Sequence, residues 1–203
     1  MSRVSRRDFL ETATKGALSA CVLSQFGLES FAAAAESEQP NLVLIAADDM
    51  GWGDVNYHGA KIDTPNINQL VKDGVELDRF YAFPVCSPTR VALMTGRSPH
   101  RMGISNPIGG ANSPKVPLDE HFFPQSLQAA GYQTWQFGKW HIGGSTIEDE
   151  LHRPNHRGFD YAYGHMGAAV TYYKHTNWRN DEVHDWYRNG EEIWEEGYST
   201  DLI

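Results

Sequence analysis

Long hydrophobic runs and positive charge are both in short supply in this 203-residue chain. No apolar stretch reaches the ~18 residues that a membrane-spanning helix needs, so we expect no transmembrane segment. Lysine and arginine number 17 against 26 aspartates and glutamates, which gives a formal net charge of −9. Such an acidic chain is not suited to nucleic acid, and an anionic ligand would have to meet a local basic pocket instead.

Cysteine is also scarce, because only Cys21 and Cys86 occur. Histidines in the last third of the chain raise the question of zinc, but no cysteine accompanies them and no regular ligand spacing repeats. The histidines considered for such a site are His152, His156, His165 and His175. We therefore do not expect a zinc site.

The rest of the composition is that of an ordinary globular protein. Hydrophobic residues make up 40% of the chain and aromatic residues 12%. These proportions exclude a disordered or collagen-like chain. The length allows one domain with a real hydrophobic core.

The first 35 residues differ from the remainder. Arg6 and Arg7 precede a weakly apolar stretch at residues 16–28, and alanines fill residues 32–35. This pattern is typical of a twin-arginine signal peptide, and a basic amphipathic helix on the mature protein is the alternative. We expect a signal at residues 1–35 that uses the twin-arginine (Tat) export machinery, a mature domain at residues 36–203, and a periplasmic or secreted location.

The two cysteines have different expected fates. Residues 18–21 resemble a lipoprotein cleavage box, which leaves open a lipid anchor at Cys21, although the apolar stretch continues past it. With Cys21 in the signal, Cys86 has no disulfide partner. An unpaired cysteine in an exported protein is buried, reactive or modified. The twin-arginine route carries folded proteins, so it would allow modification of Cys86 before export.

The sequence around Cys86 predicts a short helix. Pro88 suits a first helical turn, and Gly96 suits the left-handed position after the last turn. Cys86 and Arg90 are four residues apart and share one face of this helix. The helix N-terminus and the guanidinium both favour an anion beside the sulfur atom. The alternative is a half-buried cysteine on an ordinary capped helix.

A continuous apolar run at residues 41–47 predicts a strand buried on both faces, which is typical of the centre of a parallel sheet. Asp48 and Asp49 follow it directly. Ligands bind at the carboxyl ends of such strands, and adjacent carboxylates there suit calcium or magnesium. A solvated turn is the alternative reading of this aspartate pair.

Further elements alternate along the chain and predict an α/β fold with a mostly parallel central sheet flanked by helices. Proline-started, glycine-stopped helices are expected at residues 64–74 and 123–131, an extended segment at 75–83, a surface loop at 98–117 and a strand at 132–137. This last strand ends at Gly138, and Lys139 and His141 follow. An ammonium and an imidazole there can neutralise an oxyanion and transfer a proton, although either residue alone is commonly a solvated surface group.

Several separated motifs resemble those of one enzyme family. Cys-x-Pro-x-Arg at residues 86–90, followed by a helix and Thr-Gly-Arg, is similar to the signature of the type I sulfatases. The order of the other motifs is similar to the arylsulfatase B branch, which includes the N-acetylgalactosamine sulfatases. These motifs occupy residues 41–54, 64–66, 116–120, 138–143, 157–160 and 198–200.

The resemblance implies a fold, a reaction and site residues. The fold would be alkaline-phosphatase-like, incomplete at the C-terminus, with residues 36–203 as the N-terminal part of the catalytic domain. Asp48, Asp49 and Cys86 would contact calcium, and a sulfatase-maturing enzyme would convert Cys86 to formylglycine. Arg90 would anchor that group, and Lys139 with His141 would contact the sulfate and the nucleophile. The substrate would be a sulfated carbohydrate or an aryl sulfate.

Two other functions remain open from the sequence. A phosphate or phosphonate monoester hydrolase can share the cysteine motif, and a non-catalytic binder of sulfated glycan would keep Cys86 as a thiol. Tyr172, Tyr173 and Trp178 would suit a sugar-binding wall or ordinary packing. Family members are much longer, and further calcium ligands are expected beyond Ile203, so the resemblance implies an N-terminal fragment that is inactive alone and prone to aggregation.

Overall fold

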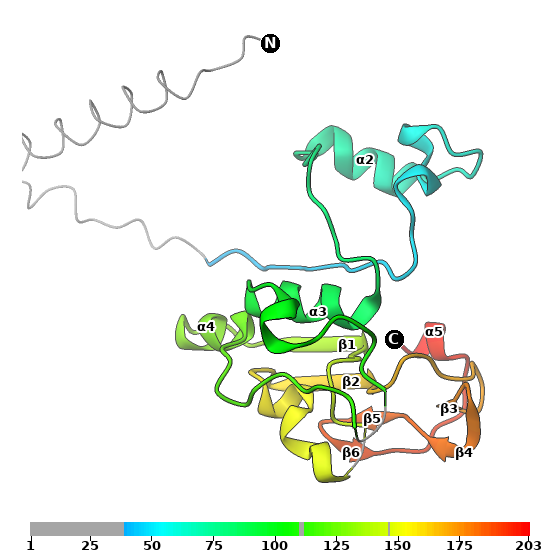
Figure 1. The fold of residues 1–203 in the computed structure, drawn as a ribbon. Coiled ribbons are helices and arrows are strands. Elements are labelled where there is room, and N and C mark those ends of the chain that lie inside the picture. Colours follow the sequence, from blue (N-terminus) through cyan, green and yellow to red (C-terminus); the bar gives the residue numbers. More distant parts are fainter. Residues whose placement is uncertain (1–38, 110–111, 146) are drawn as a thin grey trace, which may run out of the picture. The chain divides into compact units, whose positions relative to one another are not determined.

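A computed structural model describes residues 39–109, 112–145 and 147–203 (Figure 1). The chain divides into two units, Met1–Ala47 and Asp48–Ile203, which are considered separately. The predicted signal at residues 1–35, including Cys21, lies outside the described residues. No helix in the described ranges is long and apolar enough to cross a membrane.

The predicted strand at residues 41–47 is wrong for this structure. These residues form neither helix nor strand, and Val43 and Ile45 are 83% and 81% exposed. The sequence has the composition of a buried strand. A strand, however, exists only where a neighbouring chain accepts and donates its backbone hydrogen bonds. No such pairing forms for this segment within the part of the chain that the structure describes.

The second unit begins with short helical turns and the helix α2 (Pro65–Asp73), which lies within the predicted limits. A side-chain network fixes the start of α2: Thr64 Oγ1 accepts the Asn56 backbone N–H at 3.0 Å, and Asn68 Nδ2 donates to Asn56 Oδ1 at 3.1 Å. No residue of α2 is buried. The extended segment predicted at residues 75–83 forms no strand, and its apolar side chains are largely exposed.

Helix α3 (Cys86–Thr95) confirms the prediction made around Cys86. It follows Val85, which is extended, and it ends at Gly96, whose φ of 67° is left-handed. Helix α4 (Phe123–Ala129) likewise begins with a proline in its first turn. The other helical segments are η2 (Trp52–Asp54), η3 (Asn56–His58), η4 (Pro99–Met102), η5 (Ile147–His152), η6 (Pro154–His156) and α5 (Ser199–Leu202).

The main sheet has the order β1-β2-β5-β6. Strands β1 (Trp135–Lys139) and β2 (Tyr161–His165) are parallel, whereas β5 (Tyr187–Arg188) and β6 (Glu191–Glu192) join by antiparallel pairing. Strands β3 (Thr176–Asn177) and β4 (Asn180–His184) form a separate hairpin. The α/β class is thus confirmed, with a mixed sheet in the described residues. Strand β1 starts three residues later than predicted and includes Lys139.

Two glycines let β1 and β2 approach closely beside Lys139, the last residue of β1. Gly138 and Gly164 are register partners in the parallel pair. Their φ values of 85° and 140° lie in the region that favours glycine. A Cβ at Gly164 would lie 2.3 Å from the Gly138 carbonyl oxygen. Any side chain at position 164 would therefore force the strands apart next to Lys139.

The hydrophobic core joins α3 to the chain that follows β1 and β2. Its buried members are Val91, Ile104, Val116, Phe122, Trp140, Ile142, Phe159, Met166 and Tyr187. Arg157 fastens the end of the long loop to this core. Its guanidinium donates to the carbonyls of Pro117, Leu118 and Glu120 at 2.8–3.1 Å and lies 4.2 Å over the Phe122 ring.

Candidate active site

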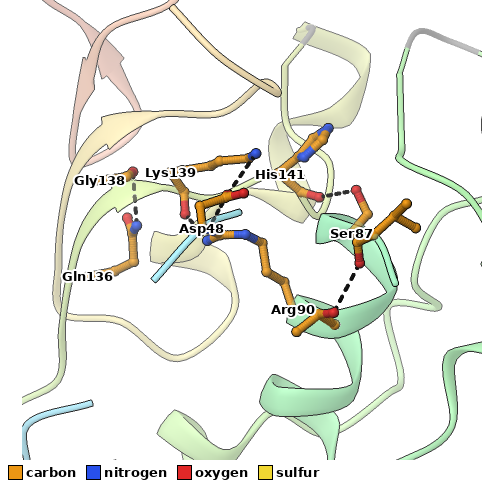
Figure 2. Close-up of polar contacts among 9 residues, drawn as sticks. Asp48, Ser87, Arg90, Gln136, Gly138, Lys139 and His141 are labelled. Carbon is orange, nitrogen blue, oxygen red and sulfur yellow. Dashed lines mark hydrogen bonds and ion pairs between the residues drawn. The ribbon is translucent and has the colours of Figure 1, made fainter. Parts of the chain in front are cut away.

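The candidate site lies where the start of α3, the end of β1 and the turn at Asp48 meet (Figure 2). Asp48 Oδ2 accepts hydrogen bonds from Arg90 at 2.9 Å and from Lys139 Nζ at 2.8 Å. Two cations therefore share one carboxylate oxygen. The cluster keeps a net positive charge, which an anion can offset.

Asp48 is ionised at neutral pH in this setting. Partial burial by itself raises the pKa of its carboxyl group, but hydrogen bonds and charge from Lys139 and Arg90 outweigh burial and hold the pKa below the ordinary value of 3.8. Its side chain is 32% exposed. The carboxylate is thus both partly solvated and anchored by its two cationic partners.

Arg90 links helix to strand as well as to the carboxylate. One of its nitrogens donates to Asp48, and the other donates to the main-chain carbonyl of Lys139. Cys86 is the first residue of α3, one turn before Arg90, and its thiol is free and partly buried. No side chain caps the N-terminus of α3. Cys86 therefore lies at an uncapped helix N-terminus, and Arg90 follows one turn later on the same face of α3.

Hydrogen bonds to the main chain of His141 fix this residue in the segment that follows β1. Ser87 Oγ donates to the His141 carbonyl at 2.7 Å and accepts the Ile108 N–H at 2.9 Å, and the His141 N–H bonds the Met166 carbonyl at 3.0 Å. Figure 2 shows the Ser87 bond running from α3 to the segment after β1. The φ of His141 is 57°, an uncommon value for a residue other than glycine.

The imidazole of His141 is buried, with 2% of the residue exposed. Burial lowers the pKa of His141 to about 4, and the charges of Lys139 and Arg90 act in the same direction, while a backbone hydrogen bond to Ile108 and the Asp48 carboxylate oppose them. The ring is therefore neutral at physiological pH. Its Nδ1 has no hydrogen-bond partner among the described residues.

Comparison with known proteins identifies the family. The Sulfatase family matches residues 40–203. The chain belongs to the sulfatase family. Arylsulfatase J of Mus musculus is 36% identical over 177 residues, covering 84% of this chain and 29% of the relative. Steryl-sulfatase of Homo sapiens is 42% identical over 138 residues, covering 63% of this chain and 24% of the relative.

Solved sulfatase-family neighbours agree with the fold. The crystal structure of Ps i-CgsB is 37% identical with a TM-score of 0.70, covering 81% of this chain and 39% of that one. This similarity confirms the predicted alkaline-phosphatase-like α/β sulfatase fold. The chain spans less than a third of the length of these curated relatives and about two fifths of the solved structure.

The structure brings together Asp48, Arg90, Lys139, His141 and Cys86 on neighbouring elements, as sulfatase motifs in the sequence led us to expect. It does not assemble a metal centre from them. Among the residues described, no three His, Cys, Asp or Glu side chains are placed to hold an ion. Asp49 is exposed with a left-handed φ of 56°. Calcium at Asp48, Asp49 and Cys86 stays a prediction.

Sequence reasoning missed His165 as a neighbour of the site. It pairs in register with Lys139, is 8% exposed, and its Nδ1 has no partner within the described ranges. Burial lowers the pKa of His165 to about 4, helped by Lys139, while a backbone hydrogen bond to Gly167 opposes the shift. The sequence could not reveal it, because only the parallel register of β1 and β2 places it opposite Lys139.

Ser87 was also missed, because nothing in Cys-x-Pro-x-Arg distinguishes its second position.

The aromatic residues considered for sugar binding lie away from these contacts in sequence, beside β3. Tyr172 and Tyr173 are 58% and 72% exposed and pack on Tyr198, and Trp178 lies under the Arg179 guanidinium at 4.5 Å.

Proposed function

We propose that this protein is a sulfuric ester hydrolase that cleaves sulfate esters through formylglycine formed from Cys86 by a sulfatase-maturing enzyme. The observation that carries the proposal is the arrangement at the start of α3. Cys86 occupies the first turn, Arg90 the next, and Asp48 binds both Arg90 and Lys139. Membership of the sulfatase family supports the same reaction.

A sulfated carbohydrate is the substrate class that we propose first. One solved relative is described in complex with a neocarrahexaose, and another is named PsFucS1 sulfatase. Aryl sulfates are the second class, since several relatives are named arylsulfatases. Either substrate presents a sulfate group to the cationic pair of Arg90 and Lys139.

The charged and neutral side chains of the site have different roles in the proposed reaction. Arg90 and Lys139 offset negative charge on the sulfate oxygens, and Asp48 holds both cations in place. The ring of His141 is neutral at physiological pH because its pKa is about 4, so it can accept a proton or share a hydrogen bond at the reacting oxygen. Formylglycine at position 86 would add water to form a geminal diol, and one of the two hydroxyls of this diol would be the nucleophile.

Calcium belongs to the proposal through Asp48 and Asp49, with residue 86 as a further contact. The family in general uses calcium with formylglycine. An ionised Asp48 and an adjacent Asp49 are hard oxygen donors, which fit such a cation chemically. They supply fewer than the ~6–8 oxygen ligands that calcium prefers, so the proposed site includes donors from other residues. When bound, calcium would stabilise negative charge on the nucleophile.

The full-length protein, made with a sulfatase-maturing enzyme, tests the reaction. We expect mass spectrometry to find formylglycine in the peptide that contains residue 86, and we expect hydrolysis of an aryl sulfate that Cys86→Ala abolishes. Faster turnover of the matched aryl phosphate would favour a phosphate monoester hydrolase instead. A stable, alkylatable thiol at Cys86 in an active preparation would contradict the proposed nucleophile.

We also propose export by the twin-arginine route, from the pattern at residues 1–35. Replacing Arg6 and Arg7 with lysine should leave the protein in the cytoplasm, because the twin-arginine pair is the feature that the machinery reads. Cell fractionation of the matched wild type and variant measures this. Equal periplasmic delivery of both proteins would contradict the proposed route, and labelling with a radioactive fatty acid would test the lipid anchor at Cys21.

A further inference from the structure

The backbone of His141 lies in a conformation that its residue type does not favour. A φ of 57° is left-handed, which brings the Cβ of a non-glycine residue close to its own carbonyl oxygen. Such conformations persist only where surrounding contacts impose them. The contacts that impose this one therefore determine where the imidazole points.

Those contacts act on the peptide groups on either side of the His141 Cα. The His141 N–H is fixed by the Met166 carbonyl at 3.0 Å, and its carbonyl is fixed by Ser87 Oγ at 2.7 Å. The ring has no partner at Nδ1 among the residues described and forms a hydrogen bond to the backbone of Ile108. The direction of the imidazole is consequently set by its own main chain and by Ile108, and Ser87 Oγ bonds both.

Ser87 is suited to this task because its own orientation is fixed. It is fully buried, and its Oγ accepts the Ile108 N–H at 2.9 Å. With one lone pair engaged in that way, the hydroxyl hydrogen is directed to the His141 carbonyl. Ser87 directly follows Cys86, so this one hydroxyl links the position of residue 86 to that of His141 across 54 residues of chain (Figure 2).

His175 shows a different way to hold a buried histidine of the same backbone type. Its φ is 55° and it is 1% exposed. Its ring, however, bonds the Gly197 carbonyl through Nε2 and stacks on Trp186 with centroids 4.6 Å apart. The ring contacts of His175 do not involve a serine hydroxyl, whereas both the carbonyl of His141 and the Ile108 backbone that its ring contacts are bonded to Ser87.

We infer that Ser87 is a positioning residue for His141: its hydroxyl holds the left-handed main chain that aims the imidazole at the nucleophile formed from Cys86. The inference rests on the proposed sulfatase function and assigns a task to the second position of the cysteine motif. Without the hydroxyl, the His141 carbonyl and the Ile108 N–H lose their partner, and the main chain can relax to a negative φ.

Steady-state kinetics of the full-length, matured protein on an aryl sulfate tests the inference through a double-mutant cycle. We expect Ser87→Ala to lower kcat ~100-fold with little change in KM, as a small displacement of a catalytic group does. In a His141→Ala background the same substitution should change kcat by less than ~3-fold, because the group that Ser87 positions is gone. Equal losses in both backgrounds would overturn the inference.

Thr95→Ala is the matched control. Thr95 Oγ1 also donates to a carbonyl, that of Val91 at 2.7 Å, and accepts a backbone N–H, that of Arg97 at 3.2 Å, but at the far end of α3. We expect its kcat to stay within ~2-fold of wild type. A loss as large as that of Ser87→Ala would show a general effect on the helix and would overturn the inference.

Maturation and folding are measured in the same preparations. Rates are divided by the fraction of residue 86 found as formylglycine, so poor conversion does not imitate a positioning defect. If Ser87→Ala does not fold, Ser87→Cys provides a weaker donor of similar size, and its expected ~10-fold loss should also vanish with His141→Ala. A loss that persists would count against the inference.

A crystal structure of the Ser87 variant gives a readout that does not depend on activity. We expect φ of residue 141 to leave the positive region, and an unchanged φ would overturn the positioning role. A wild-type protein that hydrolyses no sulfate ester would instead refute the proposed function. The two failures are therefore distinguishable, because one is measured in the backbone of His141 and the other in wild-type turnover.

Discussion

The segment at residues 52–83 and the part that contains α3, β1 and β2 both carry large apolar side chains but differ greatly in how far they bury them. Leu70 and Val75 are 67% and 87% exposed, whereas Val91 and Trp140 are at most 1% exposed. Helix α2 still forms, because its hydrogen bonds are internal and Thr64 and Asn56 organise its start. The comparison shows that local signals suffice for a helix, while burial and strand pairing depend on a partner surface.

The residues of the candidate site lie in or against the buried part of the molecule, and not in the exposed segment at residues 52–83. The described contacts among Asp48, Arg90, Lys139 and His141 all involve the buried part or the turn that docks on it. Substitutions there should have large effects, and matched substitutions in residues 52–83 should have small ones.

Asp48→Asn should lower kcat/KM of the full-length, matured protein roughly 1000-fold, which corresponds to ~4 kcal/mol of transition-state stabilisation. The substitution removes the charge that holds both Arg90 and Lys139. Asp78→Asn is the control in the exposed segment, since that side chain is 94% exposed and pairs with Arg79 only at 3.7 Å. We expect it to change kcat/KM less than ~2-fold, and similar losses in both variants would break the contrast.

Gly164→Ala should lower the free energy of unfolding by about 3 kcal/mol, because the new Cβ would meet the Gly138 carbonyl oxygen at 2.3 Å. Gly53→Ala is matched to it in the exposed segment. A Cβ there has no atom within 4 Å, so we expect a change within ~0.5 kcal/mol. Denaturant unfolding of the full-length protein measures both, and a neutral Gly164→Ala would show that β1 and β2 can separate freely.

Stability should fall as the pH is lowered from 6.5 to about 4. His141 and His165 have pKa values of about 4 in the folded protein and 6.5 when unfolded. Between these values the unfolded chain binds more protons than the folded chain, so stability present above pH 6.5 is lost as pH falls. His165→Asn should reduce that loss by roughly 2 kcal/mol in urea titrations at each pH. An identical pH profile in this variant would argue against a buried, neutral His165.

Amide exchange should differ between the two kinds of segment in the 203-residue chain. Residues 42–47 and 75–83 have no strand pairing, so we expect their amides to exchange within ~10-fold of an unfolded peptide. Amides of β1 and β2 should exchange at least ~100-fold more slowly. Hydrogen exchange with mass spectrometry measures the exchange rates of both groups of amides. Strong protection of residues 42–47 would reveal a pairing that this structure does not contain.

Elements with local signals were predictable from the sequence. Proline and glycine marked both ends of α3, and the limits of α2 followed from Thr64, Pro65 and Gly74. The run at residues 41–47 was misjudged, because composition reports that a strand would be buried but not which chain pairs with it. The two-residue strands β3, β5 and β6 carry too few residues for any periodic pattern to appear.

Prediction of the site from the sequence was limited in the same way, because contacts between distant residues could not be foreseen. Asp48, Arg90 and Lys139 were named from strand ends and helix spacing, and the structure joins them. Ser87 and His165 were not assigned to the site, because each gains its place from a partner that is distant in sequence. The Ser87 contact spans 54 residues, and that of His165 depends on the register of β1 against β2. Asp49, expected to act with Asp48, is exposed with a left-handed φ of 56°, and its role in binding calcium stays a prediction.

The clamp formed by Arg157 has a consequence for the integrity of the site. Residues 105–107 of the long loop are exposed, while the guanidinium of Arg157 fastens the end of that loop at Pro117, Leu118 and Glu120. A protease that nicked the exposed stretch would leave one piece with Cys86 and another with His141. Packing of Val91 against the shared core would keep the pieces associated. A cut in this loop would therefore break the chain between Cys86 and His141 while the two residues stay in one folded unit.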